Sequence, residues 1–566
     1  VRMGLTLKGD AYLSESTSGN ADDFDLLNVV SDTPGAGRTL QIGTLNGVAD
    51  TAFNSTLFGA GATEVTFNIF NGSLTMTNGA TILGVAQMSN SGALFIVAPG
   101  TTGSVHEVRV LDGSFQNNGD LMSFSNVVVY GAGAAQFDGR QSYITNLLLS
   151  GVGSRATFAS PDVGLGNFTI DGGEMRVVTN YTLNAAQNVT LGPAGAGFRV
   201  AEDTTLMVSN VLEGSGGLTK LGPGTMVMGN TSTYEGDTAI ERGRMILAGG
   251  ANDRLPTNTF LTMGGGVDSG ILQLGDAAGS SDQTLAGLGT SGSGADNRIV
   301  GGNALLSALT LNIGSGATNT YAGTLGGPNA NDNALAIIKD GPGTLVLDGT
   351  NTYLGPTTVR GGALLVNGDN SLADAAVSVM GAAILGGNGI IGGDTIFQAG
   401  ATNTPGFFGP GIQTFANGVT YSNASVFQWE LMANSSISGF DGVNVTSNEL
   451  NVVSGSIMSL VFDGEGSAVD WSDAFWDVGQ QWLVFDLLGT ATTNSTSSAF
   501  VIDSTYLDSL SMDLATMRPG AMFFTSYAPG GDLYLNYAIP EPSTWILLCA
   551  GLGAMVFFSR RLRQRK

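Results

Sequence analysis

The feature that most constrains the fold is a short apolar motif that recurs every 20 or 21 residues. Four copies begin with an asparagine, at Asn126, Asn146, Asn167 and Asn188, and a second apolar run such as Ala134–Phe137 follows each of them. One such unit is too short to bury its own strands, whereas stacked units bury a continuous core. The repeat therefore predicts the coils of a β-solenoid, and asparagines at one turn position of successive coils are expected to form a hydrogen-bonded ladder.

A β-sandwich with evenly spaced strands is the alternative fold, because it would also show short strands and frequent turns. It does not require asparagine and glycine to recur at fixed offsets, and we therefore favour the solenoid. The composition suits many short strands joined by tight turns, since the 566 residues include 86 glycines and only 15 prolines. Glycine tolerates positive φ, and β-branched residues fit a pleated surface.

The charge of the chain is strongly acidic. It has 21 Lys and Arg against 46 Asp and Glu, a net charge of −25, and five of the cations lie in the last seven residues. The body ahead of them is therefore more acidic still. Such a surface repels phosphate backbones, so we expect no nucleic-acid partner.

A second repeat lies further along the chain. Residues 217–247 and 336–366 align without a gap at an offset of 119, and 12 of 31 positions are identical. Both copies contain Lys-x-Gly-Pro-Gly-Thr followed by Thr-x-Thr-Tyr-x-Gly, a pattern that resembles the autotransporter-associated β-strand repeat of bacterial surface passengers. The resemblance implies a right-handed parallel β-helix, although Ser232 replaces the family's asparagine in the first copy. Lys220 and Lys339 occupy one repeat position, which indicates a structural role for both.

The composition changes after about residue 420. All five tryptophans lie beyond it, four of them ahead of the tail, and a repeat array needs an atypical end that closes its core. We therefore expect an aromatic-rich β cap region over residues 420–538, with Asp470 as the N-cap of a short helix over 470–477. Exposed tryptophans would instead allow stacking on sugar rings, so carbohydrate contact by this region stays an alternative.

The C-terminal tail combines a proline pair, an apolar run and a basic end. Pro540, Glu541 and Pro542 precede an uncharged run from Trp545 to Ser559. The prolines favour a helix that begins just after them, and the 14 residues 545–558 would span about 21 Å. That length is short for a bilayer, but long basic side chains can snorkel to the interface. The basic end is expected to stay cytoplasmic, which places the body across the membrane.

This order of elements resembles the PEP-CTERM sorting signal. The resemblance implies export, retention in the inner membrane through a transmembrane helix at about 544–559, and processing near Pro540, Glu541 and Pro542 by an exosortase-type enzyme. The expected membrane-anchor residues are Trp545, Ile546, Leu547, Leu548, Phe557 and Phe558. The expected cytoplasmic stop-transfer residues are Arg560, Arg561, Arg563, Arg565 and Lys566.

The sequence offers little for catalysis. Its single cysteine, Cys549, lies in the apolar tail, and its single histidine, His106, reads as a surface residue that faces away from Glu107 and Arg109 on a strand. Zinc sites, Cys-His dyads and most Ser-His-Asp triads need a second histidine or a usable cysteine, so they are excluded. A pair of carboxylates would be enough for a glycosidase, so a β-helix polysaccharide lyase or hydrolase stays an alternative. We expect no enzyme activity, no metal and no cofactor.

These expectations combine into one picture. The chain is predicted to be all-β: a right-handed parallel β-helix over residues 1–419, the cap over 420–538 and the sorting tail over 539–566. The opening VRMGLTLKGD lacks the pattern of a signal peptide, so we expect a trimmed or internal start. The predicted function is that of an exported structural or adhesive protein of the cell surface or matrix of a Gram-negative-type bacterium. Exopolysaccharide is a candidate partner, and a carbohydrate-binding adhesin is a second alternative.

Overall fold

The computed structural model describes residues 81–539, apart from 407–408, 495, 497–498 and 503–505, and seven short strands within the first 80 residues. The chain divides into two compact units, which are described separately. The first unit comprises residues 1–314 with 319–337, and the second comprises residues 315–318 with 338–566.

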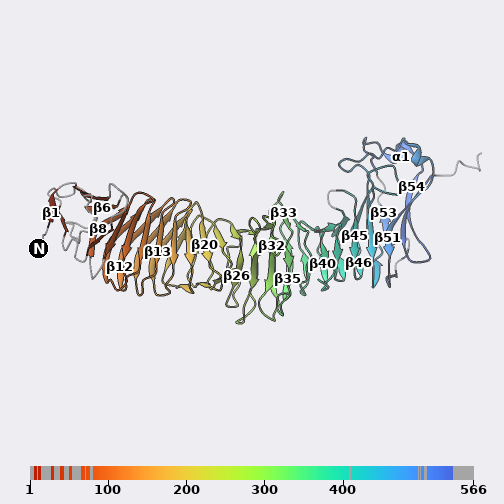
Figure 1. Cartoon of the computed structure of the whole chain (residues 1–566). Helices are drawn as coiled ribbons and strands as arrows, with labels where there is room; N and C mark the ends of the chain where they lie inside the picture. Colours follow the sequence, from red (N-terminus) through yellow and green to blue (C-terminus); the bar gives the residue numbers. More distant parts are fainter. Residues whose placement is uncertain are drawn as a thin grey trace, which may run out of the picture. The chain divides into compact units, whose positions relative to one another are not determined.

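The first unit is a stack of coils, and most of its strands lie in three parallel sheets (Figure 1). Neighbouring strands of a sheet come from neighbouring coils, so each strand pairs with the one that lies about one repeat further along the chain. The first sheet includes β8 (Thr81–Met88), β10 (Gly103–Val110), β12 (Met122–Tyr130), β14 (Tyr143–Ser150), β16 (Gly164–Asp171) and β19 (Asn188–Leu191). The second includes β11 (Ser114–Asn117), β13 (Ala134–Phe137), β15 (Arg155–Phe158), β17 (Glu174–Val177), β20 (Ala196–Val200), β23 (Leu218–Leu221) and β25 (Thr238–Ile240). The third includes β18 (Tyr181–Leu183), β21 (Thr205–Val208), β24 (Thr225–Met228) and β26 (Gly243–Leu247).

The pairing decides between the two folds that the sequence left open. A sandwich is built from antiparallel sheets, whereas the pairs of β12 with β14 and of β14 with β16 are parallel. Their register places Asn126 beside Asn146 and Asn146 beside Asn167, which is the period read from the sequence. The prediction of a parallel β-solenoid is confirmed.

The asparagine ladder is also confirmed. The side-chain amide of each asparagine donates to the side-chain carbonyl of the one before it, at 2.9 Å for Asn146 to Asn126, 2.8 Å for Asn167 to Asn146 and 3.1 Å for Asn188 to Asn167. The sequence had suggested that the ladder lies in a turn, but its asparagines lie within the strands. In β12, β14 and β16 two successive outward residues interrupt the in-out alternation at the asparagine, which marks a bend of the strand.

The core of the first unit contains a column of aromatic rings. Phe95, Phe115, Phe137 and Phe158 follow one another on successive coils, with ring centroids 5.4, 5.8 and 5.3 Å apart. All four are buried. Each ring therefore packs on its neighbour from the next coil, which gives the apolar run of each repeat its partner.

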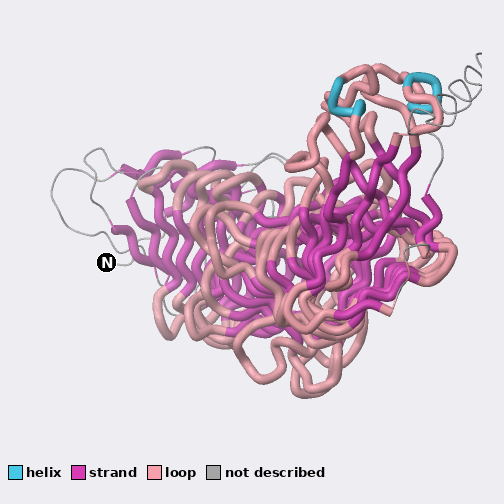
Figure 2. The backbone as a smooth tube through the Cα atoms, turned by 90° about the vertical axis from the view of Figure 1, so that its right-hand side faces the viewer, coloured by secondary structure: helices cyan, strands magenta, loops and turns pink. Residues whose placement is uncertain are grey.

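The second unit is also built from stacked parallel strands, and Figure 2 shows the strands of the molecule in magenta. One parallel sheet runs through β36 (Thr344–Leu347), β38 (Ala363–Val366), β41 (Ile384–Gly387), β44 (Thr402–Pro405), β47 (Val426–Glu430) and β50 (Ser456–Val461). Another runs through β37 (Thr357–Val359), β40 (Val377–Val379), β43 (Thr395–Phe397), β46 (Val419–Tyr421) and β49 (Glu449–Val452). A further sheet joins β45 (Ile412–Phe415), β48 (Gly442–Val445) and β51 (Gln480–Leu487), and then changes direction. On β51 the strand β55 (Leu533–Ala538) pairs antiparallel, and β54 (Met522–Tyr527) pairs antiparallel with β55.

An aromatic cluster fills the region beside these last strands. Trp429, Trp471, Trp476 and Trp482 are all fully buried, at 0% exposure. Trp471 and Trp476 meet edge to face with ring centroids 4.6 Å apart, and Trp429 meets Trp482 in the same way at 5.4 Å. These four side chains are core residues, so none of them offers a face on which a sugar ring could stack from solvent.

The short helix of this region begins later than the sequence suggested. The 3-10 helix η1 (Ala474–Asp477) has Asp473 as its N-cap, whose carboxylate accepts a hydrogen bond from the Phe475 amide. Asp470 instead accepts two bonds from Ser472, from its amide at 2.8 Å and its hydroxyl at 2.6 Å. Asp470 was therefore the wrong residue for the cap, because its carboxylate forms a local turn before the helix starts.

Candidate functional site

The predicted sorting site lies outside the part of the chain that the structure describes. This holds for Pro540, Glu541 and Pro542, for the anchor residues within Trp545–Phe558 and for the basic end Arg560–Lys566. Among the described residues, none forms a helix long and apolar enough to cross a membrane. The described chain reaches Ile539, and its last strand, β55, ends at Ala538, immediately before the proline pair.

The two repeat lysines hold the same three-carbonyl site. Lys220 is fully buried, and its Nζ donates to the carbonyls of Leu221 at 3.0 Å, Gly222 at 2.7 Å and Arg242 at 2.9 Å. Lys339 is also fully buried, and its Nζ donates to carbonyls one, two and 22 residues further on, at 2.8, 2.9 and 3.0 Å. The structural role predicted for these lysines is confirmed: each ties one coil to the next.

Burial lowers the pKa of both lysines, because the ammonium loses its hydration. The pKa of Lys220 falls to about 7, and nearby Arg199 and Arg242 add to the fall. The pKa of Lys339 falls to about 8. Three carbonyl acceptors match the three N–H bonds of an ammonium, which limits the fall.

A tyrosine and a threonine of the repeat form a second internal contact. The Tyr234 hydroxyl lies 2.5 Å from the Thr238 hydroxyl, and the Tyr353 hydroxyl lies 2.6 Å from that of Thr357. All four residues are buried. The lysine, tyrosine and threonine shared by the two repeats at these positions therefore make internal contacts, whereas other shared residues, such as Pro223 and Thr231, are exposed.

Among the described carboxylates, the one with the most strongly raised pKa belongs to a residue that solvent does not reach. Asp441 is fully buried, and its two oxygens accept from the amides of Gly411 at 2.7 Å and Glu430 at 3.0 Å. Burial raises the pKa of Asp441 to about 8, against the effect of the Gly411 amide, and the charge of Glu430 adds to the rise. Within the described residues, no group of three or more His, Cys, Asp or Glu side chains is placed to hold a metal ion.

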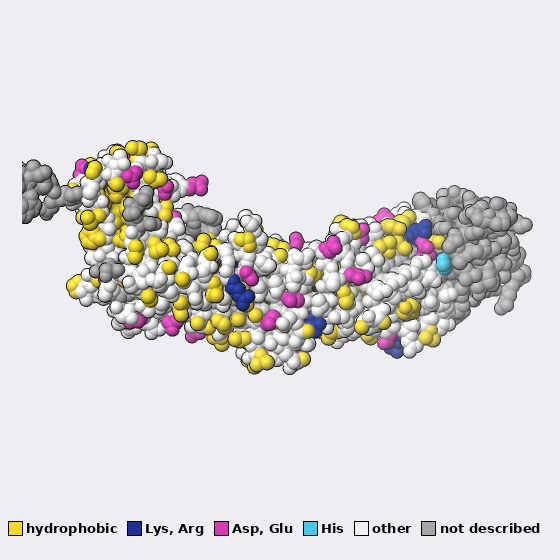
Figure 3. Space-filling view, turned by 180° about the vertical axis from the view of Figure 1, so that it is seen from behind, with side chains coloured by type: hydrophobic (Ala, Val, Ile, Leu, Met, Phe, Trp, Pro, Cys, Tyr) yellow, Lys and Arg dark blue, Asp and Glu magenta, His cyan; other side chains and the backbone are white. Residues whose placement is uncertain are grey.

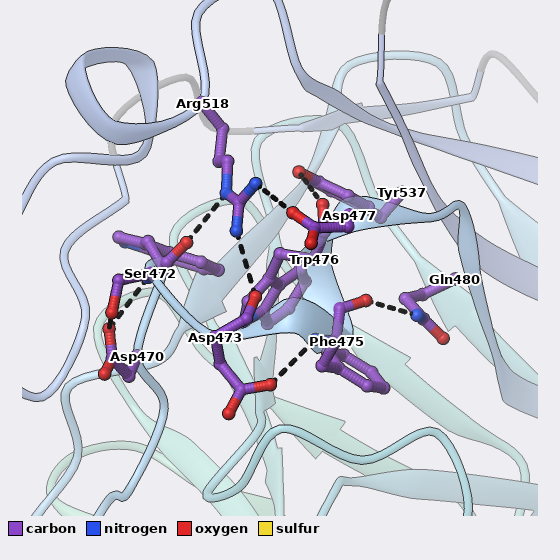
Figure 4. A network of polar contacts seen from close by, with 10 residues as sticks. Asp470, Ser472, Asp473, Phe475, Trp476, Asp477, Gln480, Arg518 and Tyr537 are labelled. Atoms are coloured by element: carbon purple, nitrogen blue, oxygen red, sulfur yellow. Dashed lines mark hydrogen bonds and ion pairs between the residues drawn. The ribbon is translucent and has the colours of Figure 1, made fainter.

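An arginine joins the aromatic cluster to the short helix (Figure 4). The Arg518 guanidinium donates to the carbonyls of Trp471 at 2.8 Å and Asp473 at 2.9 Å, and it also pairs with the Asp477 carboxylate. The Tyr537 hydroxyl donates to the Trp476 carbonyl at 3.2 Å from the other side. These contacts hold η1 over the buried tryptophans.

His106 lies at the bend of β10 and not in a regular stretch of strand. His106 and Glu107 are both half-buried and outward, because two outward residues come in succession there. Glu107 accepts a hydrogen bond from Nε of Arg109 at 2.9 Å. The expectation that simple alternation turns His106 away from Glu107 was therefore wrong, although its half-exposed position agrees with a surface residue.

A polar groove on the outward face of the second sheet was not predicted from the sequence. Arg155 on β15, Glu174 and Arg176 on β17, and Arg199 on β20 come from three successive coils. Arg155 pairs in register with Glu174, and Arg176 with Arg199. The spacing of the three arginines by about one coil was a usable signal in a chain with only 21 basic residues. The groove was missed because arginines at such positions are equally typical of charges scattered over a protein surface.

Glu174 fixes two of these arginines. Both of its oxygens accept from Nε of Arg199 at 3.0 Å, and one also accepts from Nε of Arg176. Burial alone would raise the pKa of Glu174, but the hydrogen bonds from Arg199 and Arg176 outweigh it and hold that pKa below its ordinary value. The face shown in Figure 3 is largely neutral, with acidic side chains scattered along it and basic ones gathered in a few places.

Comparison with known families identifies both sequence patterns. The Passenger-associated-transport-repeat family matches residues 218–252 and 337–366, and the PEP-CTERM protein-sorting motif matches residues 538–564. The two resemblances drawn from the sequence are thereby confirmed. The sorting motif marks the chain as an exported cell-surface protein and implies processing by an exosortase.

Two characterised proteins are similar to parts of the chain. The adhesin BmaC autotransporter of Brucella suis biovar 1 (strain 1330) is 39% identical over 93 residues, which cover 16% of this chain and 2% of that protein. Outer membrane protein A of Rickettsia rickettsii is 26% identical over 392 residues, which cover 66% of this chain and 16% of that protein. The chain thus spans a small part of each relative. It is a PEP-CTERM sorting-motif protein that carries passenger-associated transport repeats and is similar to autotransporter adhesins.

Proposed function

We propose that this protein is a structural or adhesive component of the cell surface or extracellular matrix. Its tail holds the precursor in the inner membrane until an exosortase-type enzyme cuts near Pro540, Glu541 and Pro542. One observation carries the proposal: the sorting motif over residues 538–564 begins where the last strand, β55, ends at Ala538. A cut at the proline pair releases the body with every described strand intact.

The body acts as a spacer built from coils. In support, residues shared by the two transport repeats hold neighbouring coils together, as with the carbonyl sites of Lys220 and Lys339. We propose a right-handed β-helix over residues 1–419, a cap over 420–538 and a transmembrane helix at about 544–559. The antiparallel pairing of β55 on β51 and the buried tryptophans support the cap.

The adhesive role has the support of one relative, since the matched segment belongs to a protein named as an adhesin. We further propose that the chain is not an enzyme. The carboxylate with the most raised pKa, Asp441, is enclosed by backbone amides and gives a substrate no access.

The test of this function is the fate of the tail. Replacing Pro540, Glu541 and Pro542 by alanine leaves the apolar run intact, so membrane insertion continues. Release should stop, and the protein should accumulate in the inner membrane. The readout is the C-terminal mass of protein recovered from the cell surface or the medium.

A matched control alters the other end of the tail. Reversing the charges of Arg560, Arg561, Arg563 and Arg565 should disturb orientation and retention while the proline pair stays intact. A released protein that still carries residues 545–566 would show that the tail is an ordinary anchor, and the proposal would fail.

A further inference from the structure

We infer that the groove beside Arg155 is a binding site for an acidic sugar, a sugar ring that carries a carboxylate. The inference rests on the proposed surface location and adds the class of ligand. The groove has a volume of about 370 Å³, which suits a ligand of one or two sugar rings. Arg155, Glu174, Arg176, Thr219 and Glu241 contribute its polar lining.

Arg155 provides the free cation of this groove. Its side chain is exposed, and no hydrogen bond or ion pair holds it within the described part of the chain. A guanidinium presents paired N–H donors in a planar fork that matches the two oxygens of a carboxylate. In a chain with a net charge of −25, an unpaired arginine in a groove is a specific feature of the surface.

Arg176 provides a second donor that is already in place. Its side chain is 38% exposed and is held through Nε by Glu174, which is only 18% exposed. Arg199 is bound by the same carboxylate, so Glu174 orients two guanidiniums and neutralises about one of them. The arrangement leaves a net positive charge at the Arg155 end and costs little side-chain entropy on binding, since Arg176 is ordered beforehand.

The opposite end of the groove suits the hydroxyl groups of a sugar. Glu241 lines it with a carboxylate that interacts with the charge of Arg199 and makes no side-chain hydrogen bond among the described residues, so it can accept O–H donors; Thr219 lies on β23, between β20 and β25. Glycines contribute to the lining, with Gly173 and Gly195 in connections between strands and Gly197 on β20, so backbone forms part of the groove wall. A carboxylate for Arg155 and hydroxyls for Glu241 together describe an acidic sugar, whereas a simple inorganic anion is too small to contact both ends.

The test measures binding of the full chain, in mild detergent, to polygalacturonate. Neutral dextran, poly-glutamate and inorganic phosphate serve as the comparison ligands. We expect binding to polygalacturonate that salt weakens, and at least tenfold weaker binding of the other three. Arg155→Gln should lower the affinity by about tenfold, the loss of one charge-assisted contact. Because the Arg155 side chain makes no described polar contact, the variant should fold.

The matched control is Arg360→Gln, which removes another exposed arginine with no described side-chain partner and should leave the affinity unchanged. The inference would be overturned if both variants lost the same affinity for polygalacturonate, or if poly-glutamate or phosphate bound as tightly as polygalacturonate. Either result would mean that binding is non-specific charge attraction. If polygalacturonate does not bind while the tail is still processed, the inference fails and the proposed function stands. If the tail is not processed, the proposed function fails, whatever the groove binds.

Discussion

Asn167 donates a side-chain hydrogen bond to Asn146 at 2.8 Å, one coil back along the solenoid. Both side chains are exposed, so water competes with each ladder bond and its contribution is small. The ladder nevertheless runs through four coils, and each inner member both donates and accepts.

An inner asparagine should therefore matter more than the last one. Asn146→Ala removes ladder bonds to both neighbours and should lower the free energy of unfolding by about 1 kcal/mol, whereas Asn188→Ala removes the single ladder bond to Asn167 and should cost about half as much. Hydrogen exchange of β12, β14 and β16 is the suitable measurement, because repeat arrays can open locally. Equal effects of the two variants would mean that the ladder adds nothing beyond the strands.

The two lysine sites should respond alike. Lys220→Met leaves three carbonyls without their donor, and so does Lys339→Met, so each should destabilise its coil by several kcal/mol. Thr219→Ala, at the outward neighbour of Lys220, should cost less than about 0.5 kcal/mol. Hydrogen exchange of residues 218–243 and 337–362 reports the two sites separately. Unchanged protection in the methionine variants would contradict the structural role.

Asp441 should make stability fall as the pH rises. Its pKa is raised from the ordinary 3.8 to about 8 in the folded chain, so between these values the folded state binds more protons than the unfolded state. The free energy of unfolding therefore decreases from about pH 4 to pH 8 and is flat above that range for this group. Asp441→Asn should remove this slope, even though one backbone amide then loses its acceptor. An unchanged pH profile in the variant would assign the slope to other groups.

Arg518 should be required for the packing of the tryptophan cluster. Arg518→Ala leaves the carbonyls of Trp471 and Asp473 without a donor, and we expect a loss of about 1–3 kcal/mol and a red shift of tryptophan fluorescence. Asp477→Asn is the control, because the ion pair lies at the surface and should contribute little. A larger effect of Asp477→Asn would show that the ion pair, and not the carbonyl contacts, holds η1.

Screens for turnover of acidic and neutral polysaccharides should be blank. The expectation follows from the proposal that the chain is structural or adhesive. Product formation would have to disappear when one or two neighbouring carboxylates are replaced, since a glycosidase needs such a pair. Turnover with that dependence would replace the structural proposal by the enzymatic one.

The sequence predicted those features that repeat. These features are the coil period, the strand direction, the asparagine ladder and the lysine sites. Each depends on one residue type that recurs at a fixed spacing, and stacking of the coils brings such residues into register. The aromatic region does not repeat, so its local geometry could not be read in the same way. The cap of η1 was misplaced because Asp470 and Asp473 are equally good cap residues in isolation, and only the packing of Trp471 and Trp476 selects between them.

The groove shows a second limit of sequence reasoning. Arg155, Arg176 and Arg199 are separated by 21 and 23 residues, and the additional residues fall in turns of the later coil. The register that places Arg176 beside Arg199 becomes apparent only when the turn lengths are known. Outward charges in a solenoid are therefore predictable as a set, but their partners are not.

The lysine sites give the folded protein an unusual chemical property. Between Lys8 and Lys566 the chain contains only Lys220 and Lys339, and both are fully buried. Reagents that acylate or cross-link primary amines therefore find no target on the intact middle of the molecule, and proteases that cut after lysine find no accessible bond there. A modified Lys220 or Lys339 would show that its coil had opened. Because the modification is covalent, mass spectrometry would still detect it after the coil has closed again.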